Sequence, residues 1–136
     1  MAASVLIDSG FVVALLGRGE PHHDWAVDQA RRFPPPWRTS EAVLSESFFL
    51  LGKLGGPVLT TALRRRAVIV DFSLADEVEA VLDLMRKFAQ VPMSLADAGL
   101  VRMTEKISGA VVLTTDSDFL VYRRHGRQVV PCVLPA

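Results

Sequence analysis

The feature that most constrains the fold is an alternation between short apolar runs and longer segments with helical spacing. The apolar runs cover residues 5–7, 67–70, 110–114 and 129–133 and are rich in β-branched residues, which favour strands. Their apolar character is continuous, as is typical of parallel strands buried on both faces. We therefore predict an α/β fold in which helices cover both sides of a parallel sheet.

Capping residues, glycines and prolines set the boundaries of the predicted helices. Residues 22–33 have helical spacing and stop at three consecutive prolines, which lack amide donors. Ser40 is placed to cap a helix over residues 41–54, which Gly55-Gly56-Pro57 should end before another helix reaches Arg66. Residues 37–39 form a possible short extended piece, and further helices are predicted over residues 11–16, 73–88, 94–108 and 117–124.

Length and composition limit the class of protein. A chain of 136 residues predicts one domain over residues 1–136. Lys plus Arg and Asp plus Glu are 15 each, so a nucleic-acid site would have to be a local patch rather than a bulk charge effect. The lone Cys132 cannot form an internal disulfide, and we find no apolar run near the ~20 residues of a spanning helix. We expect a cytoplasmic protein without a membrane segment.

Common ligand and nucleophile motifs are missing from the sequence. Neither GxGxxG nor GxxxxGK[ST] occurs, so we expect no nucleotide cofactor. A GxSxG nucleophile elbow is also missing, which makes serine hydrolase chemistry a poor candidate.

Two aspartates directly follow predicted strands. Asp8 comes after residues 5–7 and Asp116 comes after residues 110–114, so both should lie at the carboxyl ends of parallel strands, where ligands of such sheets bind. A capping role is an equal alternative for Asp8. Thr115-x-x-Asp118 has the spacing of a capping box, which favours a cap over a ligand at Asp118.

Glu46 interrupts the apolar side of a predicted helix. At about 100° per residue it points between Ala42 and Leu50 on the flank of the buried face, whereas Glu41 points to solvent. A carboxylate among apolar neighbours needs a cation or a proton. Lys53 is the ordinary candidate partner for Glu46, and a metal ion is the alternative.

Asp97 also faces inward on its predicted helix. It points between Leu100 and Val101, although Ser94-x-x-Asp97 fits a capping box as well. If these acids converge, their repulsion should raise at least one pKa, and a hard cation such as Mg²⁺ or Mn²⁺ would relieve it. The constellation predicts a site for one or two such ions built from Asp8, Glu46, Asp97 and Asp116.

Four segments of the sequence together resemble a known family. Residues 5–9 (VLIDS), 39–46 (TSEAVLSE), 94–98 (SLADA) and 113–119 (LTTDSDF) are similar in spacing and context to the PIN domain, particularly the VapC-type toxins of prokaryotic toxin–antitoxin pairs. The resemblance covers nearly the whole chain. It implies a three-layer α/β/α sandwich with a central parallel sheet of about five strands.

The resemblance also implies an activity, which is endonucleolytic hydrolysis of RNA phosphodiester bonds with Mg²⁺ or Mn²⁺ held by acids. The implied metal ligands are Asp8, Glu46, Asp97 and Asp116, with Asp118 as an occasional accessory. Thr114 would orient the first aspartate and Ser9 would supply a hydroxyl. Gly10 departs from the family pattern, because it removes a second hydroxyl that the family usually has near the metal.

Expectations about partners follow from local features and from the resemblance. We expect Arg123, Arg124 and Arg127 to contact RNA, whereas Arg64 to Arg66 better fit a helix C-terminus. The first helix is more apolar than one buried face requires, so we expect a homodimer. The family implies a cognate antitoxin. The main alternative is a PIN-like module that no longer cleaves and only binds RNA or protein.

Overall fold

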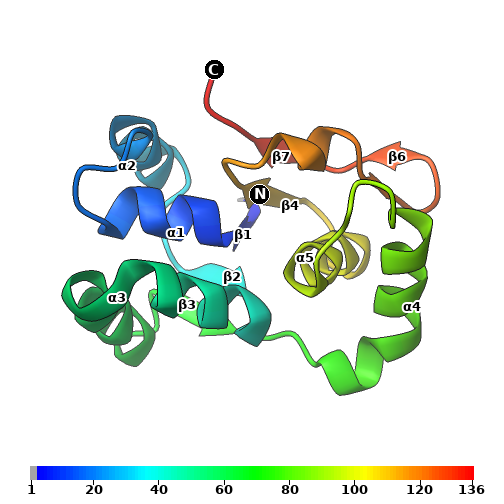
Figure 1. Ribbon diagram of the computed structural model, residues 1–136, viewed down its shortest axis with the longest axis horizontal. Helices are drawn as coiled ribbons and strands as arrows, with labels where there is room; N and C mark the ends of the chain where they lie inside the picture. The colour runs from blue at the N-terminus through cyan, green and yellow to red at the C-terminus, as the bar shows by residue number, and fades with distance from the viewer. Residues whose placement is uncertain (1–2) are drawn as a thin grey trace.

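A parallel sheet of five strands forms the centre of the molecule, in a computed structural model that describes residues 3–136. The strand order is β3-β2-β1-β4-β7, and every neighbouring pair is parallel (Figure 1). The strands are β1 (Ser4–Ile7), β2 (Trp37–Thr39), β3 (Val68–Val70), β4 (Ala110–Leu113) and β7 (Cys132–Val133). The predicted α/β class and the sandwich with about five parallel strands are confirmed.

Helices cover both faces of this sheet. One side carries α1 (Ser9–Leu16), α2 (His23–Arg32) and α3 (Glu41–Arg64), and the other carries α4 (Leu74–Lys87) and α5 (Leu95–Lys106) (Figure 1). A 3₁₀ helix, η1 (Ser117–Leu120), and a small antiparallel hairpin of β5 (Arg123–Arg124) and β6 (Gln128–Val129) lie between β4 and β7.

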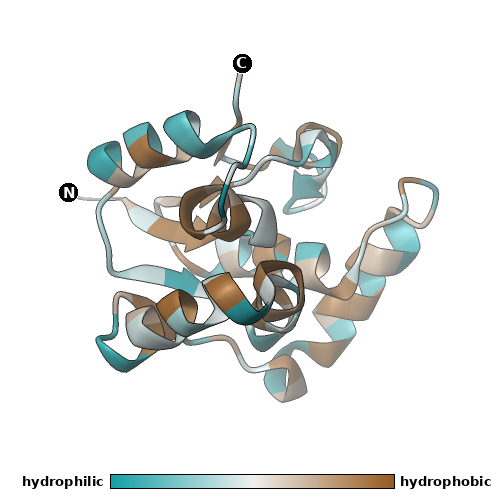
Figure 2. Ribbon diagram, turned by 60° about the vertical axis from the view of Figure 1, so that its left-hand side comes forward, coloured by the Kyte–Doolittle hydropathy of each residue, from teal (hydrophilic) through white to brown (hydrophobic). Residues whose placement is uncertain are grey.

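Strands β1 and β4 send alternate side chains into two separate cores. Leu6 and Val112 pack toward α4 and α5, whereas Ile7 and Leu113 pack toward α1 and α3. Figure 2 shows apolar residues along the strands and around much of α1. Burial on both faces explains the continuous apolar runs, since each fully buried large apolar side chain contributes about 1.5–3 kcal/mol.

The helix α3 differs from its predicted form. The break falls at Gly52, with φ 62° and ψ −154°, rather than at Gly55-Gly56-Pro57. Gly52 takes the positive φ that other residues avoid, whereas Gly55 and Gly56 are buried in the second half of the helix. By length and composition alone, α3 is also the one helix within residues 3–136 that could cross a membrane, although Gly52 divides it.

The C-terminal third also departs from the predicted elements. The segment 117–124, expected to be one helix, is the short η1 followed by strand β5. The predicted strand over residues 129–133 is divided into β6 and β7, with Pro131 between them. Proline lacks the amide that a continuous ladder requires, which accounts for the division.

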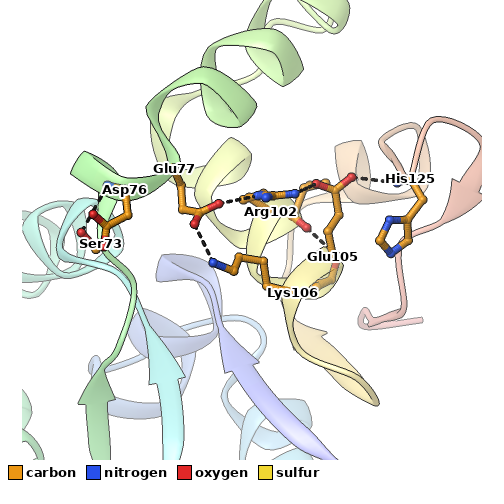
Figure 3. Close-up of polar contacts among 9 residues, drawn as sticks. Ser73, Asp76, Glu77, Arg102, Glu105, Lys106 and His125 are labelled. Carbon is orange, nitrogen blue, oxygen red and sulfur yellow. Dashed lines mark hydrogen bonds and ion pairs between the residues drawn. The ribbon is translucent and has the colours of Figure 1, made fainter.

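A cluster of ion pairs joins α4 to α5 (Figure 3). The Glu77 side chain is buried and accepts hydrogen bonds from Lys106 Nζ at 2.6 Å and Arg102 Nε at 2.7 Å. Arg102 Nη1 also donates to Glu105 at 3.1 Å, and Glu105 accepts from the backbone amide of His125 at 2.7 Å. The network therefore holds α4, α5 and the β5–β6 hairpin together.

Replacing Glu77 by glutamine should make stability less dependent on pH. Hydrogen bonds from Lys106 and Arg102 lower the pKa of Glu77 below its ordinary value of 4.5. The stabilisation is therefore complete above that value and is lost as pH falls through the lowered pKa. In thermal melts, Glu77→Gln should unfold at a lower temperature than the wild type at neutral pH, and the gap should close in acid.

The matched control is Glu79→Gln, which changes an exposed carboxylate on the same helix. This variant should melt close to the wild type throughout. A Glu77→Gln gap that is equally large at neutral pH and in acid would show that the charge of Glu77 is not what stabilises the α4–α5 contact.

Candidate active site

A polar pocket of about 400 Å³ lies at the carboxyl ends of β1 and β4. The ends of parallel strands are where α/β sheets bind ligands. Five carboxylates that the sequence singles out line this one pocket: Asp8, Glu46, Asp97, Asp116 and Asp118. They come from four separate parts of the chain, which the fold brings together.

Asp8 is the most buried of the five acids, at 5% exposure. It caps α1, and its Oδ1 accepts from the Ser9 amide at 2.8 Å. Its Oδ2 accepts from Thr114 Oγ1 at 2.8 Å. Burial raises the pKa of Asp8 to about 6, the Thr114 hydrogen bond opposes the rise, and the negative charges of Asp97 and Asp116 add to it.

Thr114 connects two of the acids. While its hydroxyl donates to Asp8, the same oxygen accepts from the Asp116 amide at 3.0 Å. The side chain is fully buried. The Thr114 hydroxyl therefore fixes the Asp8 carboxylate and the start of the loop that carries Asp116.

Asp97 lies in the first turn of α5 and is 8% exposed. Its amide donates to Ser94 Oγ at 3.0 Å, so Ser94 caps the helix as its spacing predicts. Its carboxylate Oδ2 accepts from the phenol of Tyr122 at 2.7 Å. Burial raises the pKa of Asp97, Tyr122 lowers it, and the Asp116 charge raises it further.

Glu46 reaches the pocket but is not buried, which corrects the prediction for its environment. Glu46 is exposed, and Leu50 beside it is also exposed. The buried face of α3 is formed by Val43, Leu44, Ser47 and Leu51 instead. No ion pair joins Glu46 to Lys53 in the structure, and the break at Gly52 removes the helical alignment that suggested one.

The 3₁₀ helix η1, which follows β4, is capped by a different residue from the one predicted. Asp116, rather than Thr115, caps η1, because Asp116 Oδ1 accepts from the Asp118 amide at 2.9 Å. Thr115 faces Gly10 instead. A Cβ on Gly10 would lie only 2.1 Å from Thr115 Oγ1, so the Thr115 hydroxyl occupies the space that a side chain at position 10 would need. Because both residues line the pocket, Thr115 supplies a hydroxyl beside Gly10.

The arginines expected to contact RNA do not line this pocket. Arg123 Nη1 donates to the carbonyl oxygens of Leu120 and Tyr122 at 2.8 and 2.9 Å. Arg124 Nη1 donates to the carbonyl oxygen of Thr104 at 2.9 Å. These two guanidinium groups hold backbone in place, whereas Arg127 is exposed near the turn of the β5–β6 hairpin.

The donor set fits a hard divalent cation. Carboxylate oxygens are the ligands that Mg²⁺ and Mn²⁺ prefer. Burial, and to a lesser extent the neighbouring negative charges, raises the pKa of Asp8 and Asp97. Within residues 3–136, however, no three acidic, histidine or cysteine side chains form a ready-made cage for an ion. Mg²⁺ usually keeps several waters and takes one or two carboxylates directly. Direct ligation by all four acids stays a prediction.

The sequence does not identify two residues of the site. Its pattern predicts only a helix at Tyr122, whereas the side chain is fully buried and donates to Asp97. For Thr115 the spacing predicts only a cap, whereas its hydroxyl lies against Gly10. Neither role has a local sequence signal, because each depends on a partner more than twenty residues away.

Comparison with known proteins identifies the family and the fold of the chain. The sequence matches the profile of the PIN domain over residues 5–124. The chain therefore belongs to the PIN-domain family, as the four sequence segments indicated. The crystal structure of VapC20 from Mycobacterium tuberculosis, a toxin described as cleaving the sarcin-ricin loop, is similar to this chain with a TM-score of 0.72 and 26% sequence identity. The match covers 85% of this chain and 92% of VapC20, which confirms the predicted resemblance to VapC-type toxins. A comparison with curated proteins finds no significant match.

Replacing Asp8 by asparagine should stabilise the metal-free protein at neutral and alkaline pH. Because burial raises the pKa of Asp8 from 3.8 to about 6, the ionised carboxylate lowers stability above that pH, and this penalty is absent below the ordinary value. At 1.36 kcal/mol per pKa unit the penalty is at most about 3 kcal/mol. In EDTA, Asp8→Asn should melt above the wild type at pH 8, and the advantage should disappear as pH falls through about 6 toward 4.

The control is Asp28→Asn, at an exposed position on α2 that does not line the pocket. It should show no such pH-dependent gain. If Asp8→Asn instead melts lower than the wild type at every pH, ionisation of the buried Asp8 carboxylate does not lower the stability of the protein.

Proposed function

We propose that this protein is a Mg²⁺- or Mn²⁺-dependent endoribonuclease that hydrolyses RNA phosphodiester bonds, and that it acts as the toxin of a toxin–antitoxin pair. The observation that carries the proposal is the convergence of five carboxylates in one pocket at the carboxyl end of the sheet. The family membership and the similarity to VapC20 support the same assignment.

The residues proposed to hold one or two metal ions are Asp8, Glu46, Asp97 and Asp116, with Asp118 as an accessory. When bound, such an ion activates water at neutral pH and neutralises charge on the phosphate oxygens. Among the residues that the structure describes, the only charged side chains that line the pocket are carboxylates, which would otherwise repel the phosphates of RNA. The same acids that hold the cation therefore make binding of the phosphate depend on it.

The chain's own residues act by positioning in this proposal. Thr114 and Ser9 hold the two oxygens of Asp8 in fixed directions. Asp116 is held by its own loop through the Asp118 amide. Glu46 stands at the exposed edge of the pocket, where a carboxylate can move to meet an incoming ion or water. Thr115 presents a hydroxyl to the same space.

Partners follow from the proposed role. The substrate would be RNA, the regulator would be a cognate antitoxin protein, and the location would be the cytoplasm. The α1 residues that suggested a homodimer are mostly covered within the chain, since Phe11 and Val12 are buried. We propose a homodimer on a different ground, which is an exposed apolar face on α3. This apolar face is formed by Phe48, Phe49, Leu50, Leu54 and Val58.

The competing function is an inert PIN-like module that binds RNA or protein without cleaving. Both functions share the fold, and they differ in whether the acids take up a cation. A complete acidic set favours the enzyme, because retaining buried carboxylates that repel one another destabilises a protein that has no use for them.

Mn²⁺ should raise the melting temperature of the wild-type protein. A ligand that binds only the folded state stabilises it by about 2.7 kcal/mol at 100 times its dissociation constant. We expect a concentration-dependent increase with Mn²⁺ or Mg²⁺, reversed by EDTA, in differential scanning fluorimetry. The absence of any shift with either ion would favour the inert module.

Asp97→Asn should abolish cleavage of single-stranded and hairpin RNA while the protein stays folded. Removing one carboxylate takes away a proposed ligand but also relieves repulsion with Asp116. Glu41→Gln is the matched control, because Glu41 lies on α3 and is exposed but does not line the pocket. Cleavage should be followed on labelled RNA with Mn²⁺ and with EDTA. Full activity in excess EDTA, or a loss at Glu41 equal to that at Asp97, would contradict the proposed site.

A further inference from the structure

The strongest unexplained feature near the pocket is the hydrogen bond between Tyr122 and Asp97. The phenol oxygen lies 2.7 Å from Asp97 Oδ2, and both side chains are buried. The donor follows η1, while the acceptor lies in the first turn of α5, 25 residues earlier. A short hydrogen bond to a buried carboxylate is among the stronger kinds in proteins.

Tyr122 is held rigidly by its neighbours. Its ring packs edge-on against Phe88 at 5.4 Å between centroids and against Phe119 at 5.2 Å. Its amide donates to the carbonyl oxygen of Asp118 at 3.1 Å. The pKa of the Tyr122 phenol is raised, first by burial and then by the hydrogen bond to Asp97, so the phenol stays protonated as the donor.

The contact completes a pattern on the two most buried acids of the pocket. Thr114 holds Asp8 through a hydroxyl at 2.8 Å, and Tyr122, which follows η1, holds Asp97 in the same way at 2.7 Å. The residues from Asp116 to Tyr122 thus carry two acids of the pocket and the hydroxyl that holds a third, Asp97. Partners of this kind orient ligating carboxylates in metal sites.

We propose that Tyr122 is a positioning residue that fixes the Asp97 carboxylate for binding of a divalent cation. It does not contact substrate and is not a catalytic residue. Its effect is on metal affinity. Without the hydrogen bond from Tyr122, the Asp97 carboxylate must be ordered when the ion binds, and this cost weakens binding. The inference rests on the proposed metal-dependent function.

Tyr122→Phe is the direct test, because it removes only the hydroxyl and keeps the ring that packs on Phe88 and Phe119. Loss of an outer partner of a metal ligand typically weakens metal binding by 10–100-fold. We expect the Mn²⁺ dissociation constant, measured from the electron paramagnetic resonance signal of free Mn²⁺, to rise by about tenfold or more.

Thr104→Val provides a matched control. It removes a hydroxyl that is equally buried on α5 and donates to the Val101 carbonyl at 2.6 Å, away from the acids. Both variants should lose some thermal stability, but only Tyr122→Phe should change the Mn²⁺ dissociation constant. If Tyr122→Phe melts lower than the wild type and binds Mn²⁺ equally well, the residue is only structural and the inference is overturned.

A second measurement leaves the fold intact. Tyr122 is the only tyrosine of the chain, so incorporation of 3-fluorotyrosine gives one ¹⁹F resonance that reports on this contact. We expect that resonance to shift on titration with Mg²⁺, with a midpoint equal to the binding constant. A resonance that does not move while Mg²⁺ binds would overturn the inference even if Tyr122→Phe does not fold.

The outcomes separate the two proposals. A wild-type protein that binds neither Mn²⁺ nor Mg²⁺ would overturn the proposed function and the inference together. A wild type that binds these ions, with an unchanged Tyr122→Phe constant, would overturn only the role of Tyr122.

Discussion

The parallel pairing of β1 with β4 is the constraint on which the candidate site depends. Its register places Ile7 beside Leu113, so Asp8 and Thr114, which follow these residues, meet although they are 106 positions apart. A slip of the register by one residue would move the side chains of Leu113 and Thr114 each to the other face of the sheet. Burial of alternate residues in two cores excludes that slip, and thus the same apolar side chains that stabilise the sheet also position the Asp8 carboxylate.

The fold and most of the acidic site could be predicted from local sequence. The positions of Asp8 and Asp116 follow from adjacency to strands, and the inward direction of Asp97 follows from helical spacing. The environment of Glu46 could not be predicted in this way. Helical geometry gives the angle of a side chain but not which element lies opposite, and here the flank of α3 faces an open pocket.

Errors in the helices have a related cause. Gly52, Gly55 and Gly56 have similar intrinsic preferences, so the sequence alone does not select which of them takes the positive φ. Tertiary packing selects Gly52, which is exposed, and buries the other two. Likewise, residues after Asp116 are apolar enough for a helix, but η1 ends at Leu120, so that Tyr122 reaches Asp97 and Arg123 donates to the preceding carbonyls.

The apolar face of α3 has a consequence for how the chain behaves in concentrated solution. Phe49 is 85% exposed and Leu54 is 72% exposed, while the whole sequence carries a formal net charge of zero. Charge repulsion between molecules is therefore weakest near neutral pH, where hydrophobic contact between such faces promotes association and precipitation. A partner that covers this face would prevent association and precipitation of the protein, in addition to any effect that it has on activity.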